Sequence, residues 1–403
     1  MKKRKITPEN KKIYIFVSII LWIIVWEVLD IIISNSILFA GPVEVILRLK
    51  ELCLDGQFWN DVVGSLIRIT IGFVTGVSVG IILAAMSYRF QVVRFLLEPP
   101  VAVIKAAPVA SFVVLFLIWW KSSVLSVAIS FFVVMPQIYI SVLKGLNNTD
   151  RQLLEMAEVF GINRLKRIRY IYMPAVRPFF EGTVSVAIGL AWKSGVAAEV
   201  IGTPDNSIGG SLYMSKIYLD TSGVLAWTLV VILLSVCFER FVTMLVSRKK
   251  RPGFLHGRAG TKDNHSVRRQ AADIPVDEYI RRKEDDNSVS LEAVKISKSF
   301  GDNRILNDYS VNLKSGDIQV YDWESGTGKT TLFRIIAGLE MADTGEVSCV
   351  GRIAYIFQED RLLPWCSAKE NLAFIGTDAD RAQKLLDEIG IGEYSEALPD
   401  ELS

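Results

Sequence analysis

Histidine and cysteine are both scarce in this chain. Of its 403 residues only two are histidines, His256 and His265, and both lie in a polar segment without apolar periodicity. We therefore expect neither a histidine-based metal site nor a catalytic triad that contains histidine. The four cysteines show no pairing or metal-ligand spacing, which suits reduced or membrane-buried thiols. They are Cys53, Cys237, Cys349 and Cys366.

Long apolar runs are abundant, and hydrophobic residues make up 51% of the chain. A helix that crosses a membrane needs about 20 predominantly apolar residues. The first run lacks the short apolar core and small-residue cleavage site of a signal peptide, so we expect an uncleaved span. The pattern predicts an all-α polytopic membrane domain with roughly six crossings. These are residues 13–33, 67–86, 95–119, 124–143, 179–199 and 224–246.

Lysine and arginine gather in short loops that such a topology places on one side of the membrane. They occur at residues 2–5, in the loop with Arg89 and Arg94, at residues 155–174, and at residues 248–251. Short loops rich in lysine and arginine face the cytoplasm. The sequence therefore predicts a multi-pass protein of the bacterial cytoplasmic membrane, with both ends of the membrane domain inside.

Charged residues and prolines also occur within the apolar runs. Pro108 follows Lys105 closely, and Lys193 and Glu199 lie six residues apart. Such residues are tolerated at membrane depth where neighbouring helices or a water-filled cavity satisfy them. Lys105, Lys193 and Glu199 are candidates for the translocation path. The alternative is that Lys193 and Glu199 reach a helix end or form a structural ion pair.

Residues 151–174 form a basic segment between two predicted spans. Ala157 and Gly161 lie four residues apart, so on a helix they share a face that lets another protein approach the backbone closely. We expect leucine at position 161 to hold such a partner away. Gly161 can end the first helix, Asn163 can cap a second, and Pro174 stops that second helix.

The spacing E-x-A-x3-G-x9-I-x-M-P in this segment resembles the EAA loop of ABC importer permeases. Met156 and Met173 depart mildly from the pattern. In that family the loop forms the coupling helix that docks into the ATPase. Weaker signatures, GPVEV and AWKSGVAAEVIG, resemble permeases for sulfonate, taurine and nitrate. The residues that match the EAA pattern are Glu155, Ala157, Gly161, Ile171 and Pro174.

A soluble α/β region follows the membrane domain. Residues 248–287 have mixed charge and no apolar periodicity, which predicts a flexible linker between a permease domain at 1–247 and a second domain at 288–403. In that second domain a glycine-rich segment follows a predicted strand and opens a helix. Its backbone N–H groups can surround phosphate, with Lys329 for the outer phosphates and the Thr330 hydroxyl for Mg²⁺. The segment comprises Ser325, Gly326, Thr327, Gly328, Lys329, Thr330 and Thr331.

This half resembles the N-terminal part of an ABC ATPase domain. By that resemblance Phe300 stacks on adenine, and Gln358 is the Q-loop glutamine that reaches the metal and the attacking water. Trp323 and Glu324 depart from the phosphate-loop pattern, and we expect them to weaken MgATP binding. The family places its signature motif and Walker B strand after the LPDE segment, and neither occurs before Ser403. We therefore expect a partial P-loop NTPase domain, and no catalytic residue is identified.

Together these features predict the permease component of an ATP-driven importer that moves a small solute inward, with ATP and Mg²⁺ as cofactors. The resemblance implies a second permease subunit, ATPase domains or a separate ATPase subunit, an extracytoplasmic substrate-binding protein and membrane lipid, and no nucleic acid. It favours a small organic anion such as a sulfonate over vitamin or pyrimidine precursors. The alternatives are a membrane-anchored, non-hydrolysing nucleotide-binding or docking module, or an incomplete gene product.

Overall fold

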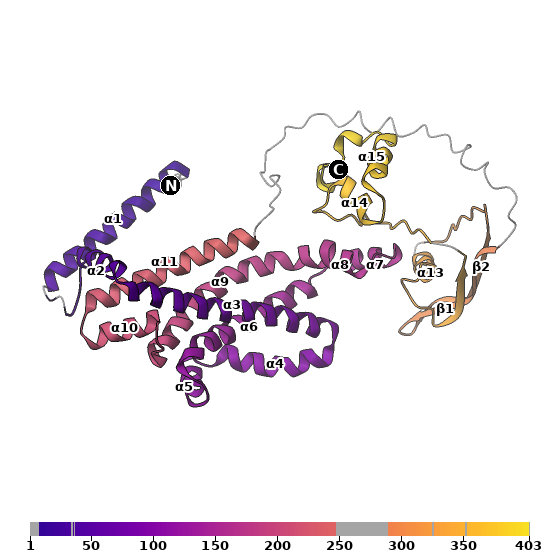
Figure 1. Ribbon diagram of the computed structural model, residues 1–403. Helices are drawn as coiled ribbons and strands as arrows, with labels where there is room; N and C mark the ends of the chain where they lie inside the picture. Colours follow the sequence, from indigo (N-terminus) through magenta and orange to yellow (C-terminus); the bar gives the residue numbers. More distant parts are fainter. Residues whose placement is uncertain are drawn as a thin grey trace, which may run out of the picture. The chain divides into compact units, whose positions relative to one another are not determined.

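The computed structural model describes residues 8–33, 35, 37–246, 289–324, 326–350 and 353–402 (Figure 1). It separates into two compact units. The first unit contains the apolar helices, and the second combines residues 148–175 with the C-terminal region. The predicted linker at 248–287 and Ser325 lie outside the described residues.

Helices are the only regular secondary structure in the described part of the first unit. Its long apolar helices alternate with shorter segments at their ends (Figure 1). The helices are α1 (Pro8–Ile33), α2 (Pro42–Leu54), α3 (Gly56–Arg89), α4 (Gln91–Ala106), α5 (Val109–Trp119), α6 (Ser122–Asn147), α9 (Met173–Gly202), α10 (Ile208–Ile217) and α11 (Thr221–Val246).

The helices confirm the predicted membrane crossings. Five of the described helices are long and apolar enough to span a membrane, and the count reaches six if α4 and α5 form one bent span. The bend between α4 and α5 is 105° and falls beside Pro108. Pro99 and Pro100 lie inside α4 and do not break it.

Helices α3 and α6 pack closely along their length, and Figure 1 shows them side by side. Gly72, Gly76 and Gly80 recur every four residues on α3 and face α6. A Cβ at Gly72 would lie 2.5 Å from the carbonyl oxygen of Val127, and one at Gly80 2.9 Å from that of Met135. Small residues at this spacing let two membrane helices approach backbone to backbone.

The second unit contains an antiparallel sheet of three strands in the order β2-β1-β3. β1 (Val289–Phe300) and β2 (Asn303–Lys314) form a hairpin through a turn at Gly301, whose φ is +59°. β3 (Thr344–Cys349) pairs with the other edge of β1. Lys295 and Asp308 have positive φ where the register shifts, so bulges interrupt both long strands.

Short helices complete this unit. They are α7 (Arg151–Val159), α8 (Arg164–Arg167), the π-helical turn η1 (Ile168–Tyr172), α13 (Lys329–Ile336), α14 (Ala368–Phe374), α15 (Ala379–Glu388), the 3-10 turn η3 (Gly392–Tyr394) and α16 (Pro399–Leu402). The strand predicted before the phosphate loop does not form, and the described residues 353–357 before Gln358 form no strand either. Residues 317–324 and 353–357 form no strand and pair with none of the described strands.

Candidate coupling and nucleotide site

A side-chain cap marks the start of helix α7, and the helix ends before Gly161 as predicted. The Asp150 side chain accepts a hydrogen bond from the Gln152 N–H (2.8 Å) and caps the start of the helix. Gly161 follows the helix with φ +61°, and the Asn163 side chain caps α8 by accepting from the Lys166 N–H (2.8 Å). These caps fix the direction of α7 and therefore the face that it presents.

The Glu155 carboxylate on α7 binds two arginines of the C-terminal region. Arg334, at the end of α13, donates to both oxygens, with distances of 3.0 and 3.1 Å. Arg361 donates to Oε2 at 2.9 Å. The three side chains are largely buried, with exposed fractions of 16%, 24% and 11% respectively. One carboxylate thus joins the helix after the phosphate loop to the segment after Gln358.

The ion pairs hold the carboxylate in its charged form. The hydrogen bond from Arg334 lowers the pKa of Glu155 most, burial raises it, and the hydrogen bond from Arg361 lowers it further, so the pKa lies below its ordinary value. The same bond raises the pKa of Arg334. Opposite charges that share hydrogen bonds stabilise each other's ionised forms.

An apolar cluster surrounds this ion pair. Ala157 and Ile171 are fully buried in it, and Leu363 and Phe374 pack there from the C-terminal region. The Tyr170 ring meets the Phe374 ring edge to face at 5.5 Å. The buried members of the cluster are Leu153, Met156, Ala157, Ile162, Ile171, Leu363, Cys366 and Phe374. The basic loop and the C-terminal region therefore share one core.

Gly161 does not share the close contact of Ala157. It is exposed, and an added Cβ would have no neighbour within 4 Å. The expected small face for close approach is therefore wrong for Gly161. Its left-handed backbone, with φ +61°, requires glycine instead, since most side chains are strained there.

Pro174 does not stop the second helix, contrary to the prediction. Residues 164–202 run on as one helix through the π-turn η1. In an α-helix the residue at position 174 would donate to the Tyr170 carbonyl, and proline has no N–H to do so. The Trp365 indole N–H donates to that carbonyl at 2.8 Å.

The phosphate loop adopts a conformation that requires its glycines. Gly326 and Gly328 have φ of +87° and +99°. A Cβ at Gly328 would lie 2.6 Å from the Ile305 side chain on β2, so a residue larger than glycine would clash at this position. α13 begins at Lys329, and the exposed Thr330 follows in its first turn. These residues fit a bound phosphate group.

Trp323 and Glu324 differ in their surroundings. The Trp323 ring packs edge to face against Tyr309 at 5.0 Å and Tyr321 at 5.9 Å, while Glu324 is exposed. The Trp323 carbonyl accepts a hydrogen bond from the Lys329 ammonium. The lysine expected to reach phosphate is thus held by the segment that departs from the family pattern.

Phe300 and Gln358 take different positions around this loop. Phe300 is half exposed at the end of β1, pairs with Asn303 across the hairpin, and lies 5.3 Å below the Lys298 ammonium. Because Gly328 lies against Ile305, the phosphate loop and Phe300 share one end of the hairpin. Gln358 is exposed three residues before Arg361.

Two family models match this chain. Residues 76–251 match the one described as the binding-protein-dependent transport system inner membrane component, and residues 306–403 match the one described as ABC transporter. The chain joins an importer permease domain to an ABC transporter domain. The permease domain is a multi-pass membrane domain, and the ABC domain lies in the cytoplasm.

Curated relatives exist for both domains. The ABC domain is 40% identical over 110 residues to the aliphatic sulfonates import ATP-binding protein SsuB 1 of Pseudomonas savastanoi pv. phaseolicola, over 26% of this chain and 46% of that protein. The permease domain is 23% identical over 228 residues to SsuC of Bacillus subtilis, a permease named for aliphatic sulfonates transport, over 55% of this chain and 81% of that protein. The chain thus spans about half the length of its ATP-binding relatives, 46% in the first case.

A solved chain of an amino acid ABC transporter is 14% identical to this one. The match has a TM-score of 0.39 and covers 51% of this chain and 97% of that one.

The candidate path residues of the permease domain are not brought together as a group. Glu199 is fully buried on α9 and accepts from Arg68 Nε (3.1 Å) and Ser65 Oγ (2.6 Å) on α3. Its ion partner is therefore Arg68, while Lys193 is exposed. Lys105 is exposed in the last turn of α4, before the bend.

Sequence reasoning missed several residues of these sites. Arg334 and Arg361 lie 179 and 206 positions from Glu155, and Arg68 lies 131 positions from Glu199. No local pattern marks such distant partners. Trp365 had one available signal, because the proline at 174 leaves a backbone carbonyl without its helical donor.

Proposed function

We propose that this chain forms the permease and part of the ATP-binding apparatus of an importer that moves a small organic anion, such as a sulfonate, into the cytoplasm. The permease domain comprises residues 1–247, and the ABC part comprises residues 288–403. Relatives of both domains are named for aliphatic sulfonates, which supports this substrate class over vitamin or pyrimidine precursors.

The observation behind this proposal is the binding of Glu155 by Arg334 and Arg361. Any movement of α13 relative to the segment after Gln358 alters the distances from Glu155 to the two guanidinium groups. The coupling loop, residues 151–174, therefore senses both segments at once. Its contact residues in this role are Glu155, Ala157 and Ile171, with Gly161 and Pro174 shaping the backbone.

The nucleotide site follows from the phosphate loop. In this proposal the backbone of residues 325–331 surrounds the phosphates, and Lys329 moves from the Trp323 carbonyl to the outer phosphate oxygens. Thr330 and Gln358 hold Mg²⁺, which would neutralise phosphate charge when bound. Phe300 stacks on the base at the end of the hairpin.

The proposed assembly contains further components. A second permease copy completes the path, an extracytoplasmic binding protein delivers the solute, and ATPase domains or a separate ATPase subunit supply turnover. Lys105, Lys193 and Glu199 remain candidates for the path, with Glu199 bracing α3 against α9 through Arg68.

Uptake into proteoliposomes tests the proposal. The full chain would be reconstituted with a sulfonate-binding protein and a separately supplied ATP-binding subunit, and uptake of labelled butane-1-sulfonate measured with and without ATP. We expect ATP-dependent uptake that falls at least tenfold in Glu155→Gln and persists in Glu158→Gln, an exposed neighbour on α7. Uptake of a pyrimidine precursor in place of the sulfonate would reject the substrate class.

A second function is favoured by the contact between Lys329 and Trp323. A lysine held by its own loop suits a membrane-anchored docking module that does not hydrolyse ATP. ATP turnover by the purified chain alone should then equal that of Lys329→Ala. Turnover that depends on Lys329 would reject this second function.

A further inference from the structure

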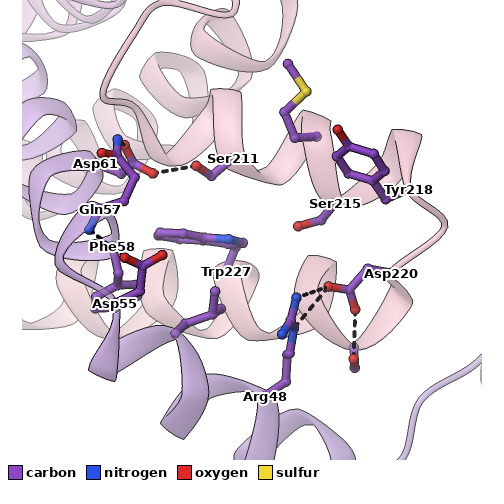
Figure 2. Close-up of a pocket in the computed structure, with 13 residues that line it drawn as sticks. Arg48, Asp55, Gln57, Phe58, Asp61, Ser211, Ser215, Tyr218, Asp220 and Trp227 are labelled. Atoms are coloured by element: carbon purple, nitrogen blue, oxygen red, sulfur yellow. Dashed lines mark hydrogen bonds and ion pairs between the residues drawn. The ribbon is translucent and has the colours of Figure 1, made fainter.

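A cavity of about 580 Å³ opens at the end of the permease domain where α11 begins. Its walls come from α2, the first turns of α3, α10 and the start of α11 (Figure 2). Helix α11 is long and apolar enough to span a membrane, and its C-terminal end leads into the basic residues 248–251, which are predicted to lie on the cytoplasmic side. The cavity therefore faces the extracytoplasmic side.

Negatively charged side chains outnumber positively charged ones in the lining of the cavity. Three carboxylates line it, those of Asp55, Asp61 and Asp220, against the one guanidinium of Arg48. Arg48 donates to Asp220 at 3.0 and 2.8 Å and to Glu51 at 2.9 Å, so its charge is already matched. Asp55 and Asp61 leave the opposite end of the cavity negative.

The carboxylates at the two ends differ in their bonding. Burial raises the pKa of Asp220, but hydrogen bonds from the Gly223 N–H, Ser222 and Arg48 lower it by more. The pKa of Asp220 therefore lies below its ordinary value. Asp61 accepts from Gln57 (2.9 Å) and from the hydroxyl of Ser211. Each of its oxygens has a second lone pair and can still accept from a ligand.

An aromatic floor connects the two ends. Figure 2 shows the Trp227 indole between Asp55 and Asp61 on one side and the Arg48–Asp220 pair on the other. Trp227 is only 3% exposed, and its ring lies 5.0 Å from that of Phe58. Aromatic faces attract ammonium and guanidinium groups, and tryptophan does so best.

We propose that this cavity binds a small organic cation, with an ammonium group at Asp55 and Asp61 and its carbon chain along Trp227. Its volume lies in the range of about 300–1,000 Å³ that is typical of small-molecule sites. An anion would meet unmatched carboxylates and no unmatched guanidinium in the lining. The lining therefore disfavours a sulfonate as the occupant, and the inference does not depend on the proposed function.

Calorimetry on the full chain in detergent tests the site with butane-1,4-diamine as the probe. Butane-1,4-diol has the same chain length and no charge, and butane-1-sulfonate has it with a negative charge. A tetralysine peptide represents a basic segment of a docking protein. We expect the diamine to bind with a Kd below about 1 mM, more weakly at high salt, and the other three compounds not to bind. Binding of the peptide alone would overturn the proposal in favour of a protein surface.

Matched variants assign the binding to the cavity. Asp55→Asn keeps a good helix cap, and Asp61→Asn keeps an acceptor for one of its donors, so both should fold. Each should weaken the diamine at least tenfold, or about 1.4 kcal/mol. Asp205→Asn removes an exposed charge outside the lining and should leave the Kd unchanged. Equal affinity of Asp55→Asn, Asp61→Asn and the parent chain, or no diamine binding at 10 mM (about ten times the expected Kd), would overturn the proposal.

Discussion

The Glu155 carboxylate lies 3.0 Å from the guanidinium of Arg334, although 179 positions separate the two residues in the chain. This pair links the loop between two membrane helices to the helix that begins at the phosphate loop. Arg361 completes the arrangement from the segment after Gln358. The carboxylate is therefore placed to respond to either segment.

Substitutions at Ala157 and Gly161 should separate packing from backbone conformation. Ala157 is fully buried in the shared core, so Ala157→Leu should overpack it and cost about 1–3 kcal/mol of docking free energy. Gly161→Leu should cost about 1–2 kcal/mol through its positive φ, and Gly161→Asn much less, because asparagine tolerates this conformation. Uptake in proteoliposomes should rank Asn above Leu at position 161. Equal loss of uptake in Gly161→Leu and Gly161→Asn would show that space, and not φ, limits position 161.

The bond from Trp365 to the Tyr170 carbonyl should contribute to coupling. Trp365→Phe retains the ring but removes the N–H donor, so we expect a loss of about 1 kcal/mol and a several-fold lower uptake. Pro174→Ala would supply a helical N–H that competes for the same carbonyl, and its effect should resemble that of Trp365→Phe. If the two effects are fully additive in the double variant, the bond does not depend on the proline.

The altered phosphate loop should weaken nucleotide binding. Glu324 places a carboxylate beside the phosphate site, where repulsion at about 4 Å costs roughly 1–4 kcal/mol depending on the dielectric. Trp323→Gly with Glu324→Pro should therefore tighten MgATP binding at least tenfold, or about 1.4 kcal/mol, as measured by calorimetry. The gain should be larger at low salt, where the repulsion is less screened. Asp322→Asn removes an exposed charge in the same segment and is the control. Equal affinity of the parent and the double variant would mean that the altered loop is harmless.

Much of this architecture could be predicted from local sequence. Apolar length located the crossings, and Asn163 and Gly161 marked the helix ends in the basic loop. Pro174 misled, because a π-turn precedes it and the helix continues. The strand predicted before the phosphate loop does not form, because an apolar segment becomes a strand only where its backbone pairs with a neighbouring strand.

The sites themselves depended on distant pairs. Glu155 could be singled out from its loop, but nothing near it indicates Arg334 or Arg361. The pairing of Glu199 with Arg68, and not with the nearer Lys193, likewise follows from the packing of α3 against α9. Sequence spacing suggests ion pairs between charged side chains on the same helix, whereas the packing of the helices pairs Glu199 with a residue on another helix.

The pH dependence of docking should follow the ionisation of Glu155. Its pKa in the folded chain lies below the ordinary 4.5, so the contribution of the ion pairs is fully present above that value and lost as pH falls through the lowered pKa. Hydrogen exchange of residues 361–374 should therefore differ between the parent chain and Glu155→Gln by a constant free energy from about pH 5 to 8. The difference should shrink below about pH 4. A difference that changes near pH 7 would point to another titrating group.

The most direct measurement is the labelling rate of the Cys366 thiol, which is 4% exposed in the core shared by the loop and the ABC domain. The other three cysteines are exposed and would be replaced by serine. Loss of the bonds to two arginines in Glu155→Gln should cost roughly 2–3 kcal/mol and speed maleimide labelling about 30- to 150-fold. Glu158→Gln should label at the parent rate. Equal rates for Glu155→Gln and the parent chain would contradict the account that Glu155 joins the loop to the ABC domain.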